Sequence, residues 1–541
     1  MARLDAQVAV VGAGPIGMTL AGRLAQHGVS VILLEQHPGH QGEGSKALCM
    51  QRETLEIWAR LGIGEQVARR GVQWSVGRTY YRGRELFQVR LPAQQGDHFP
   101  PFVNISQTEV EELLLTRLGE VAGVEQRWGH RLVGLVQDAE SVTLRCETPI
   151  GETKLRVAYA VGTDGAHSGV RSVLGAGFPG HSHRDLFLIC DIRAQLAFPN
   201  ERRFHFDPPW NPGRQVLIHP QPDDTWRIDW QVPAETDAEA ERANGGLDRR
   251  IRQVIGPGTD YELLWLTAYR FQQRVADRFR VGRVFLAGDA AHVVSPFGAR
   301  GLNSGVADAE NLAWKMALVL DGRAPDALLE SYQTERRAAA VENEAVTDAT
   351  MRFMVPHGPL RRLQRNAILR GSLRLRQLRR LVNSGRLAQP FVYADSPIIA
   401  RSKPDQRVPT VGAAMPDAAC SVLGRTPRVP GRIARVRDLF GDQFVALLVV
   451  NGEKQAASAA VRAMRLAWAA PCRVALVGAS RPLAGVTVLS DPSGELRRSF
   501  GGAGSYAFLV RPDGHLAASL PLPSVEAVDA LAGLQARAIG A

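Results

Sequence analysis

Three glycines near the start of the chain are spaced as in turns that bind the phosphates of a dinucleotide. The segment is a GxGxxG pattern made of Gly12, Ala13, Gly14, Pro15, Ile16 and Gly17. A strand pattern precedes it and a helical pattern follows it, and only in that context is the motif informative. Gly12 permits a tight turn, Gly14 lets a pyrophosphate approach, and Gly17 lets the helix pack on the strand. We expect the N–H groups that begin this helix to bind phosphate.

A carboxylate stands where such a turn needs one. Glu35 follows a second strand pattern and lies roughly 20 residues after Gly12, where a carboxylate accepts hydrogen bonds from a ribose. Its negative charge would repel a 2′-phosphate, so we expect FAD or NAD in this slot and not NADP. The next residue, Gln36, is included among the expected cofactor contacts.

A second glycine-rich segment, far downstream, indicates a flavin. A strand pattern over 283–287 is followed by Gly288, Asp289 and small residues up to His292. The segment 295–305 then leads through a glycine-rich turn into a helix. Asp289 is placed to accept hydrogen bonds from polyol hydroxyls. The start of the helix offers N–H groups to the negative charge that a reduced flavin carries near N1 and O2.

The elements that position these motifs follow from the spacing of apolar residues. Strand patterns over 7–11 and 29–34 flank a helical pattern over 18–26, a βαβ opening that implies a parallel sheet. Further along we assign a helix over 107–118, strand-rich regions over 131–160 and 186–232, a strand over 284–287, a helix over 307–320 and more helices to about 385. A proline-rich passage over 389–416 precedes a third unit, with core strands over 445–450, 474–477 and 507–510 and a helix over 524–537.

Composition excludes several classes of protein. The chain has 541 residues and a net charge of +11, and its densest basic run, 361–380, is predicted to be an amphipathic helix with a solvated basic face. Neither zinc-finger spacing nor a single-strand stacking platform accompanies it, so we expect no nucleic-acid binding. The five cysteines form no CxxC, which argues against a disulfide framework or a metal site and for a cytoplasmic location. No run of about 20 apolar residues predicts a membrane span.

Taken together, the motifs resemble those of the class A flavoprotein aromatic hydroxylases, which share the fold of para-hydroxybenzoate hydroxylase and phenol hydroxylase. The resemblance is strongest to the 3-(3-hydroxyphenyl)propionate hydroxylase group. It rests on the first glycine turn with Glu35, on Gly162-Thr163-Asp164-Gly165-Ala166-His167-Ser168 with Arg171, and on Gly288-Asp289-Ala290-Ala291-His292 with its continuation. These motifs span most of residues 1–385.

The resemblance implies an α/β fold in which a Rossmann-like FAD-binding domain is interleaved with a mixed-sheet substrate domain. The FAD-binding domain would comprise 1–180 and 270–385, with 70–105 contributing to the substrate side. Residues 181–269 would form the substrate-binding sheet and 386–420 a linker. Residues 421–541 would form a thioredoxin-like domain that is structural, because it lacks CxxC. Through the resemblance, the C-terminal unit also leads us to expect a homodimer.

The resemblance also assigns roles to single residues. Gly12, Gly14, Gly17 and Glu35 would hold the ADP half of FAD, and Asp289 the ribityl chain. The remaining expected contacts are Gln107 with the flavin, Gly301, Leu302 and Asn303 with the pyrimidine edge of its ring, Asp164 with both FAD and NAD(P)H, and Pro296 with the substrate. The chain departs from many relatives at Lys46, where they have arginine, and at Ala299-Arg300, where they have Gly-Gln or Gly-Gly. Lys46 would supply charge without arginine's fork.

The implied reaction is hydroxylation of a phenolic compound by NADH or NADPH and O2, through a flavin C4a-hydroperoxide. No second GxGxxG occurs, so the nicotinamide would visit without a domain of its own. The substrate is expected between 186–232 and the flavin. Candidate polar contacts are His205, Asp207, His219, Arg227 and Asp229, and candidate catalytic residues are Pro296, Arg300, His205 and His219. The alternatives are a tailoring oxygenase for a polyketide or antibiotic, a non-oxygenating FAD oxidoreductase, and a flavin- or partner-binding protein without catalysis.

Overall fold

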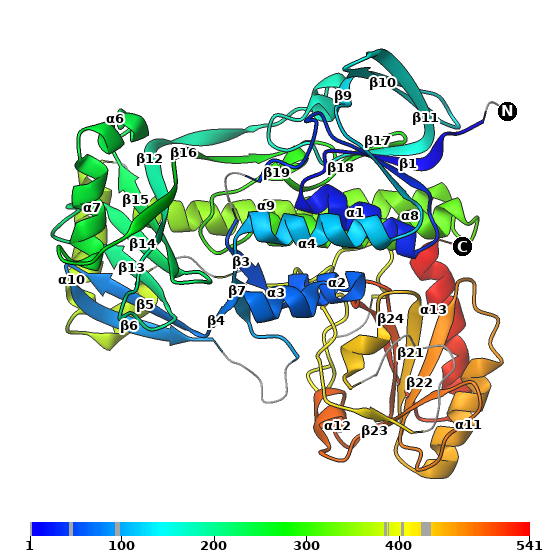
Figure 1. The fold of residues 1–541 in the computed structure, drawn as a ribbon. Coiled ribbons are helices and arrows are strands. Elements are labelled where there is room, and N and C mark those ends of the chain that lie inside the picture. The colour runs from blue at the N-terminus through cyan, green and yellow to red at the C-terminus, as the bar shows by residue number, and fades with distance from the viewer. Residues whose placement is uncertain are drawn as a thin grey trace.

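Two large β-sheets and a smaller C-terminal sheet organise the chain (Figure 1). The computed structural model describes residues 3–42, 47–91, 98–356, 358–382, 387, 389–401, 405–423 and 434–540. Long helices run between the first two sheets, and the C-terminal unit packs against the helices of the first (Figure 1).

The first sheet grows from the predicted βαβ opening. β1 (Ala6–Val11) pairs in parallel with β2 (Val31–Leu34) across α1 (Pro15–Gln26), and also with β11 (Gly151–Gly162), which confirms the parallel sheet. β11 also pairs in parallel with β18 (Val284–Leu286), so the two glycine turns leave the same end of the two strands that flank β11. The sheet also contains β8 (Val124–Arg127), β9 (Arg131–Gln137), β10 (Val142–Thr148) and β17 (Arg280–Val281).

Helices cover this sheet and bring the second motif to the first. α1 packs between α4 (Gln107–Glu120) and α8 (Gly301–Leu320). α8 begins directly at the glycine turn, six residues before the predicted start at 307. The start of the helix therefore lies within the motif itself.

The second sheet combines strands from separate parts of the chain in the order β19-β16-β12-β15-β14-β13-β5-β6. Its members are β5 (Val76–Tyr81), β6 (Arg84–Arg90), β12 (Gly180–Arg193), β13 (Arg202–Phe206), β14 (Gln215–Pro220), β15 (Thr225–Val232), β16 (Glu262–Val275) and β19 (His292–Val293). The strand-rich character predicted for 186–232 is confirmed. Because side chains alternate between the two faces of a strand, each strand contributes to two different environments.

The two faces of the second sheet are covered differently. On the outer face, Ile228 and Trp230 pack with Leu247 and Ile251 of α7 (Gly246–Ile255), and α6 (Ala238–Ala243) lies beside α7. On the inner face an aromatic cluster packs against α9 (Glu330–Met354) and α10 (Pro359–Ser372); it contains Phe187, Phe204, Phe206, Phe271 and Phe297 together with Met351, Met354 and Leu369.

Short elements lie between the two large sheets. β3 (Cys49–Gln51), β7 (Phe102–Asn104) and β4 (Val72–Trp74) form a three-stranded antiparallel sheet. α2 (Arg52–Leu61) and α3 (Gly64–Arg70) extend from it toward the C-terminal unit (Figure 1). α5 (Gly169–Val173) follows the Asp164 motif.

The C-terminal unit has a sheet of its own, in the order β20-β23-β22-β21-β24-β25. The three predicted core strands are confirmed as β21 (Phe444–Val449), β22 (Cys472–Val477) and β24 (Tyr506–Val510). The others are β20 (Ser421–Val422), β23 (Thr487–Ser490) and β25 (Leu516–Pro521), and the helices are α11 (Glu453–Met464), α12 (Glu495–Ser499) and α13 (Ala530–Ile539). The final helix starts as a 3₁₀ turn over Val525–Asp529.

Buried polar contacts join this unit to the rest of the chain. Arg511 donates to both carboxylate oxygens of Glu335 on α9, at 2.5 and 3.0 Å. Arg437 donates to Glu56 of α2 at 2.6 and 2.7 Å. Arg23 of α1 donates to the carbonyl of Gly441 at 2.6 Å. The C-terminal unit thus contacts the helices that carry and flank both glycine motifs.

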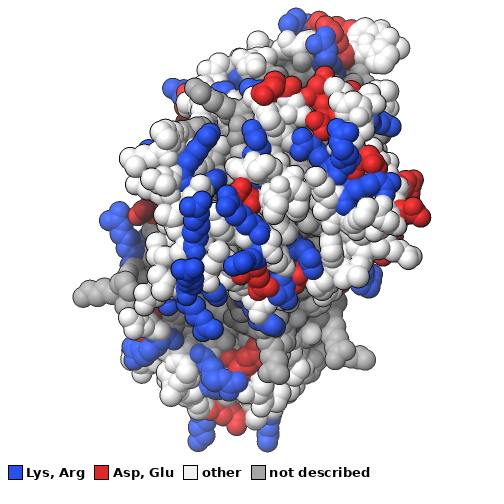
Figure 2. Space-filling model, turned by 90° about the vertical axis from the view of Figure 1, so that its left-hand side faces the viewer, with Lys and Arg blue, Asp and Glu red and all other residues white. Residues whose placement is uncertain are grey.

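The arginine-rich segment differs from the single helix predicted over 361–380. α10 ends at Ser372, and a 3₁₀ turn over Arg376–Leu381 follows. The chain folds back because Leu378 lies over Gly371, where an added Cβ would sit 2.4 Å from Leu378 Cδ1. Figure 2 shows that Lys and Arg side chains are spread over this side of the molecule among acidic ones. No helix in the described ranges is long and apolar enough to cross a membrane.

Candidate active site

The first glycine turn has the geometry that its motif predicts. Gly12 has a φ of +105°, and a Cβ there would lie 2.7 Å from the carbonyl oxygen of Thr163. A Cβ on Gly17 would lie 2.0 Å from the carbonyl oxygen of Gly12. A Cβ on Gly14, by contrast, would meet no described atom within 4 Å. Two glycines are therefore needed for packing, and the third borders open space at the start of α1.

Glu35 fastens this turn to the next loop. Its carboxylate accepts a hydrogen bond from Ala13 N at 2.9 Å and from His37 N at 3.0 Å. Each oxygen keeps a further lone pair for a ligand hydroxyl. Gln36 is exposed beside it.

The second glycine motif meets the first at Ile16. A Cβ on Gly288 would lie 2.9 Å from Ile16 Cγ1, and one on Gly305 would lie 2.7 Å from Ile16 Cδ1. Because glycine has no side chain at these two positions, η1 (Gly288–Ala290) and α8 can lie close to α1. Two segments nearly 300 residues apart in sequence therefore form one site. Asp289 is exposed at this junction.

Both helices that begin at this junction present uncapped N-termini. Among the described residues no side chain caps α1 or α8. A Cβ on Gly301 would meet no atom of the described residues within 4 Å, so the start of α8 also borders open space in this part of the structure. The unpaired N–H groups and the helix dipole favour negative charge there. These features fit a phosphate at α1 and an anionic ring edge at α8, as an extended flavin dinucleotide requires.

Asn303 holds the small sheet in place. Its Oδ1 accepts from Gln51 N at 3.0 Å and from Thr54 Oγ1 at 2.7 Å. Its Nδ2 donates to the carbonyls of Cys49 at 2.9 Å and Ala299 at 2.6 Å. The oxygen and the nitrogen of the side chain amide are thus both bonded within the chain.

Two further predicted contacts also organise loops. Gln107 accepts from Ala47 N at 3.1 Å and donates to Glu111 at 2.8 Å. Asp164 accepts from Ser168 Oγ at 2.5 Å and Val170 N at 3.0 Å, and burial raises its pKa. Lys46 lies outside the described residues.

Arg171 links the Asp164 motif to the Gly288 motif. It donates to the carbonyl of Ala290 and to that of Ala166, each at 2.8 Å. All three motifs that carry the family resemblance therefore meet in one place.

Pro296 and Arg300 lie in the turn before α8. Pro296 is exposed, and its carbonyl accepts from Ala299 N at 3.1 Å. Arg300 is 4% exposed and donates to Asn343 on α9 and to the carbonyl of Leu387 at 3.3 Å. Its guanidinium is thereby directed toward α9. Ala299 has a φ of +57°, an uncommon conformation for a residue with a Cβ.

The strand register separates the predicted polar contacts of the substrate sheet. Leu217 pairs with both Phe204 and Asp229, which places Asp229 on the inner face with Phe204. His219 and Arg227 share this face by alternation.

His205 pairs with Val216 and so lies on the opposite, outer face, whereas Asp207 follows β13 in a turn with a φ of +47°. The ring of His205 stacks on Tyr80 at 4.6 Å, and Asp207 accepts from Arg82 at 2.7 Å. The structure therefore does not bring His205 together with His219.

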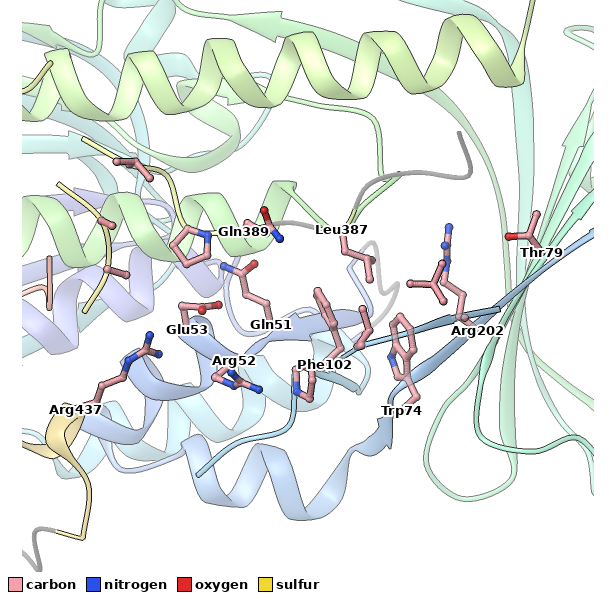
Figure 3. A pocket seen from close by; sticks show the side chains of 18 residues that line it. Gln51, Arg52, Glu53, Trp74, Thr79, Phe102, Arg202, Leu387, Gln389 and Arg437 are labelled. Atoms are coloured by element: carbon pink, nitrogen blue, oxygen red, sulfur yellow. The ribbon is translucent and has the colours of Figure 1, made fainter. Parts of the chain in front are cut away.

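A cavity of about 650 Å³ opens between the substrate sheet, the small sheet and the C-terminal unit (Figure 3). Thr79 and Arg202 of the substrate sheet lie at one end, Arg437 of the C-terminal unit lies at the other, and Trp74 and Phe102 lie between them. The rings of Trp74 and Phe102 stack at 5.5 Å. Sequence reasoning did not single out these residues, because they come from short strands whose pairing is not local.

Comparison with known proteins agrees with this geometry. The family model described as "FAD binding domain" matches residues 5–347, well over half of the chain. The rifampicin monooxygenase of Streptomyces venezuelae is 36% identical over 353 residues, which cover 64% of this chain and 71% of the relative.

Two further proteins match almost the whole chain. The 3-(3-hydroxy-phenyl)propionate/3-hydroxycinnamic acid hydroxylase of Mycobacterium sp. (strain JLS) is 28% identical over 521 residues, covering 94% of this chain and 88% of the relative. The crystal structure of aklavinone-11 hydroxylase with FAD and aklavinone superimposes with a TM-score of 0.75 at 26% identity, covering all of both chains. The extent of the family match and the convergence of its motifs on one junction show that this chain belongs to the FAD-binding-domain family of class A flavin monooxygenases.

Proposed function

We propose that this enzyme hydroxylates a phenolic aromatic compound, with FAD bound at the junction of the glycine motifs and NAD(P)H and O2 as co-substrates. The observation that carries the proposal is the meeting of the two motifs at Ile16, which gives one site two uncapped helix N-termini. The inner face of the substrate sheet supplies an aromatic wall beside it.

In this proposal the chain holds the cofactor along its whole length. Gly12 to Gly17 and the start of α1 bind the pyrophosphate, and Glu35 binds a ribose hydroxyl. Asp289 binds the ribityl chain, and the backbone from Gly301 to Asn303 faces the pyrimidine edge of the ring. Bound FAD supplies hydride acceptance from the nicotinamide and the activation of O2.

The residues around the ring position the substrate and exclude water. Phe187 stacks on Phe271 at 4.3 Å, and both lie edge-on to Phe297 at 5.6 Å. Phe297 follows Pro296 directly, so this apolar wall is continuous with the turn before α8. An apolar wall of this kind excludes water and so prevents side reactions of reactive intermediates.

The cavity suits either of two substrate sizes. At about 650 Å³ it lies within the usual range for small-molecule sites. The buried guanidinium of Arg202 at one end favours an aromatic compound with an anionic oxygen there, such as the ionised hydroxyl of a hydroxyphenylpropionate. The length of the cavity, which reaches Arg437 of the C-terminal unit, favours a larger polyketide or antibiotic as the second candidate.

Product analysis with ¹⁸O2 tests the proposal. The purified FAD enzyme would be supplied with NADH or NADPH and a panel of hydroxyphenylpropionates, simple phenols and polycyclic phenols. We expect substrate-stimulated nicotinamide oxidation and a product heavier by one ¹⁸O atom. Nicotinamide oxidation without label in any aromatic would identify a non-oxygenating FAD oxidoreductase instead.

We also propose a division of the chain into domains. Residues 1–180 and 270–385 form the FAD-binding domain, with 70–105 on its substrate side, 181–269 form the substrate sheet, and 386–420 form a linker. We propose a thioredoxin-like architecture for 421–541, supported by the adjacent strands β22-β21-β24-β25, by α11 between β21 and β22, and by α13 after β25. The five unpaired cysteines support a reducing, cytoplasmic location. We also propose that the protein forms a homodimer.

A further inference from the structure

Three polar side chains stand on adjacent strands of the inner face of the substrate sheet. Phe204 pairs with Leu217, and the preceding residue Arg203 pairs with Ile218, so Arg202 lies opposite His219. Leu217 pairs in turn with Asp229. Cβ atoms at directly opposed positions are about 5 Å apart, and diagonal neighbours stay within reach of long side chains. Arg202, His219 and Asp229 therefore form one cluster, which we call the sheet triad.

A neighbouring ion pair shows what a structural role on this face looks like. Arg227 donates to both oxygens of Asp191, at 2.8 and 2.7 Å, and Gln221 donates to the same carboxylate at 2.9 Å. These groups are buried and satisfied by one another. The triad differs, because Asp229 Oδ1 and His219 Nδ1 are buried without a hydrogen-bond partner among the described residues. A buried polar atom left unpaired is costly unless a ligand or water completes it.

The triad lies next to the proposed flavin site. Asn303, in the first turn of α8, donates to the carbonyl of Cys49. The Cys49 thiol is close enough to Arg202 for the two to interact electrostatically, and burial, opposed by that guanidinium, raises the pKa of the thiol to about 12. Arg202 also lines the cavity, beside Trp74 (Figure 3). Cys49 is thus bonded to α8 and interacts electrostatically with one member of the triad.

We propose that Asp229 is the base that deprotonates the phenol, while Arg202 and His219 hold the phenol oxygen; this rests on the function proposed above. The O–H bond of the phenol breaks, its electron pair stays on the oxygen, and the proton moves to a carboxylate oxygen of Asp229. The resulting negative charge lies beside the guanidinium of Arg202. The proton passes to solvent when the product leaves. An ionised ring is the more electron-rich acceptor for oxygen.

The charges around Asp229 suit such a base. Burial raises its pKa to about 7, with Asp191 acting in the same direction and Arg227 and Arg202 opposing. Cys190, on the outer face, is neutral because burial raises the pKa of its thiol well above the ordinary value.

The other two members of the triad have fixed charge states near neutral pH. His219 is neutral because burial, Arg202 and Arg227 lower its pKa. Arg202 stays charged, since burial lowers its pKa only to about 10. Above pH 7 Asp229 is ionised and can accept a proton, and below pH 7 it is protonated and cannot.

The test compares Asp229→Asn with the wild-type holoenzyme. We expect kcat/KM for hydroxylation to rise with pH through about 7 in the wild type, and this rise to be absent in Asp229→Asn. We expect the variant to lose roughly 10²–10⁴-fold in hydroxylation rate. FAD content and the rate of flavin reduction should be retained, so that NAD(P)H oxidation continues and releases H2O2.

The acidity of the substrate separates a base from a structural residue. A phenol that is already ionised in water needs no base, so the loss in Asp229→Asn should shrink along a series of increasingly acidic fluorophenols. The wild type alone allows the same test. Below pH 7 its rate of hydroxylation should fall with weakly acidic phenols and should not fall with strongly acidic ones. The matched control is Asp224→Asn, in the exposed β14–β15 turn, where φ is +54° and asparagine is tolerated.

Arg202→Met should act on binding, with KM for phenols raised more than kcat is lowered. An unchanged pH profile in Asp229→Asn, or a loss that does not depend on phenol acidity, would overturn the role of Asp229 while phenol hydroxylation by the wild type still stood. A wild type that hydroxylates no phenol would overturn the proposed function as well.

Discussion

Replacing Arg511 by methionine should strongly destabilise the fold. Arg511 is fully buried, bonds both oxygens of Glu335, and donates to Asp513 at 3.1 Å. Without it Glu335 keeps one cationic partner, Lys315 at 2.7 Å, and two neutral donors, Asn311 at 2.7 Å and Ser396 at 2.6 Å. Removing one partner of a buried ion pair leaves an uncompensated charge and costs about 3–5 kcal/mol.

Denaturant unfolding with and without FAD measures this cost, with tryptophan and flavin fluorescence as separate probes. Methionine keeps most of the volume of the side chain, so the loss reports charge and hydrogen bonding more than packing. The matched control is Arg462→Met, because Arg462 pairs with Asp529 in the same unit but both are more than 40% exposed. That change should cost below about 1 kcal/mol.

A double variant, Arg511→Met with Glu335→Leu, sharpens the test. Removing both partners should cost less than the sum of the single changes, since Glu335 is then no longer left buried without Arg511, while Asp513 loses Arg511 in both variants and keeps Trp314 as a donor. A loss below about 1 kcal/mol for Arg511→Met alone, or strict additivity in the double variant, would refute the reasoning from burial.

Three further outcomes follow from the site. Gly17→Ala should prevent stable folding, whereas Gly14→Ala should keep the fold and lose FAD affinity; thermal unfolding and FAD retention on gel filtration separate the two, and equal effects on folding would contradict the open space at Gly14. Asn303→Leu should lower FAD affinity by roughly tenfold or more, because it removes two hydrogen bonds to β3, one to α2 and one to the turn before α8, each worth about 1 kcal/mol; equilibrium titration with FAD measures it. His292 and Arg336 outweigh burial and lower the pKa of Asp308, so its stabilisation is present above its unfolded pKa and lost as pH falls through the folded value. Asp308→Asn should therefore lower the free energy of unfolding near neutral pH and weaken its dependence on acid pH; denaturant unfolding at several pH values measures both, and an unchanged pH dependence would contradict the reasoning.

The sequence sufficed for the first sheet and the cofactor junction because their signals are local. The GxGxxG turn can be identified from the spacing of its glycines alone. The close contacts at Gly12 and Gly17 explain why these positions are glycine. β3, β4 and β7 were not predicted, since each has only three residues and no periodicity to detect. The cavity depends on Trp74 and Phe102 from these strands, and so it was missed.

Which face of the substrate sheet a residue occupies could likewise not be predicted from the local sequence. His205 and His219 both lie in strands, but which face each occupies depends on the register between strands, and a shift of one residue would reverse it. Arg300 shows a different limit, because its partner Asn343 lies on another helix. The arginine-rich helix ended early because Leu378 packs over Gly371, a contact that periodicity does not report.

The buried contacts of the C-terminal unit have a consequence for synthesis on the ribosome. Glu335 and Arg23 are translated long before Arg511 and Gly441, which complete their bonding. A nascent chain that already contains both glycine motifs therefore has the pairs Arg23–Glu310 and Glu335–Lys315 but still lacks the partners that complete them. The flavin-binding half should close late, once almost the entire polypeptide has left the exit tunnel, and early termination should yield a product that chaperones retain.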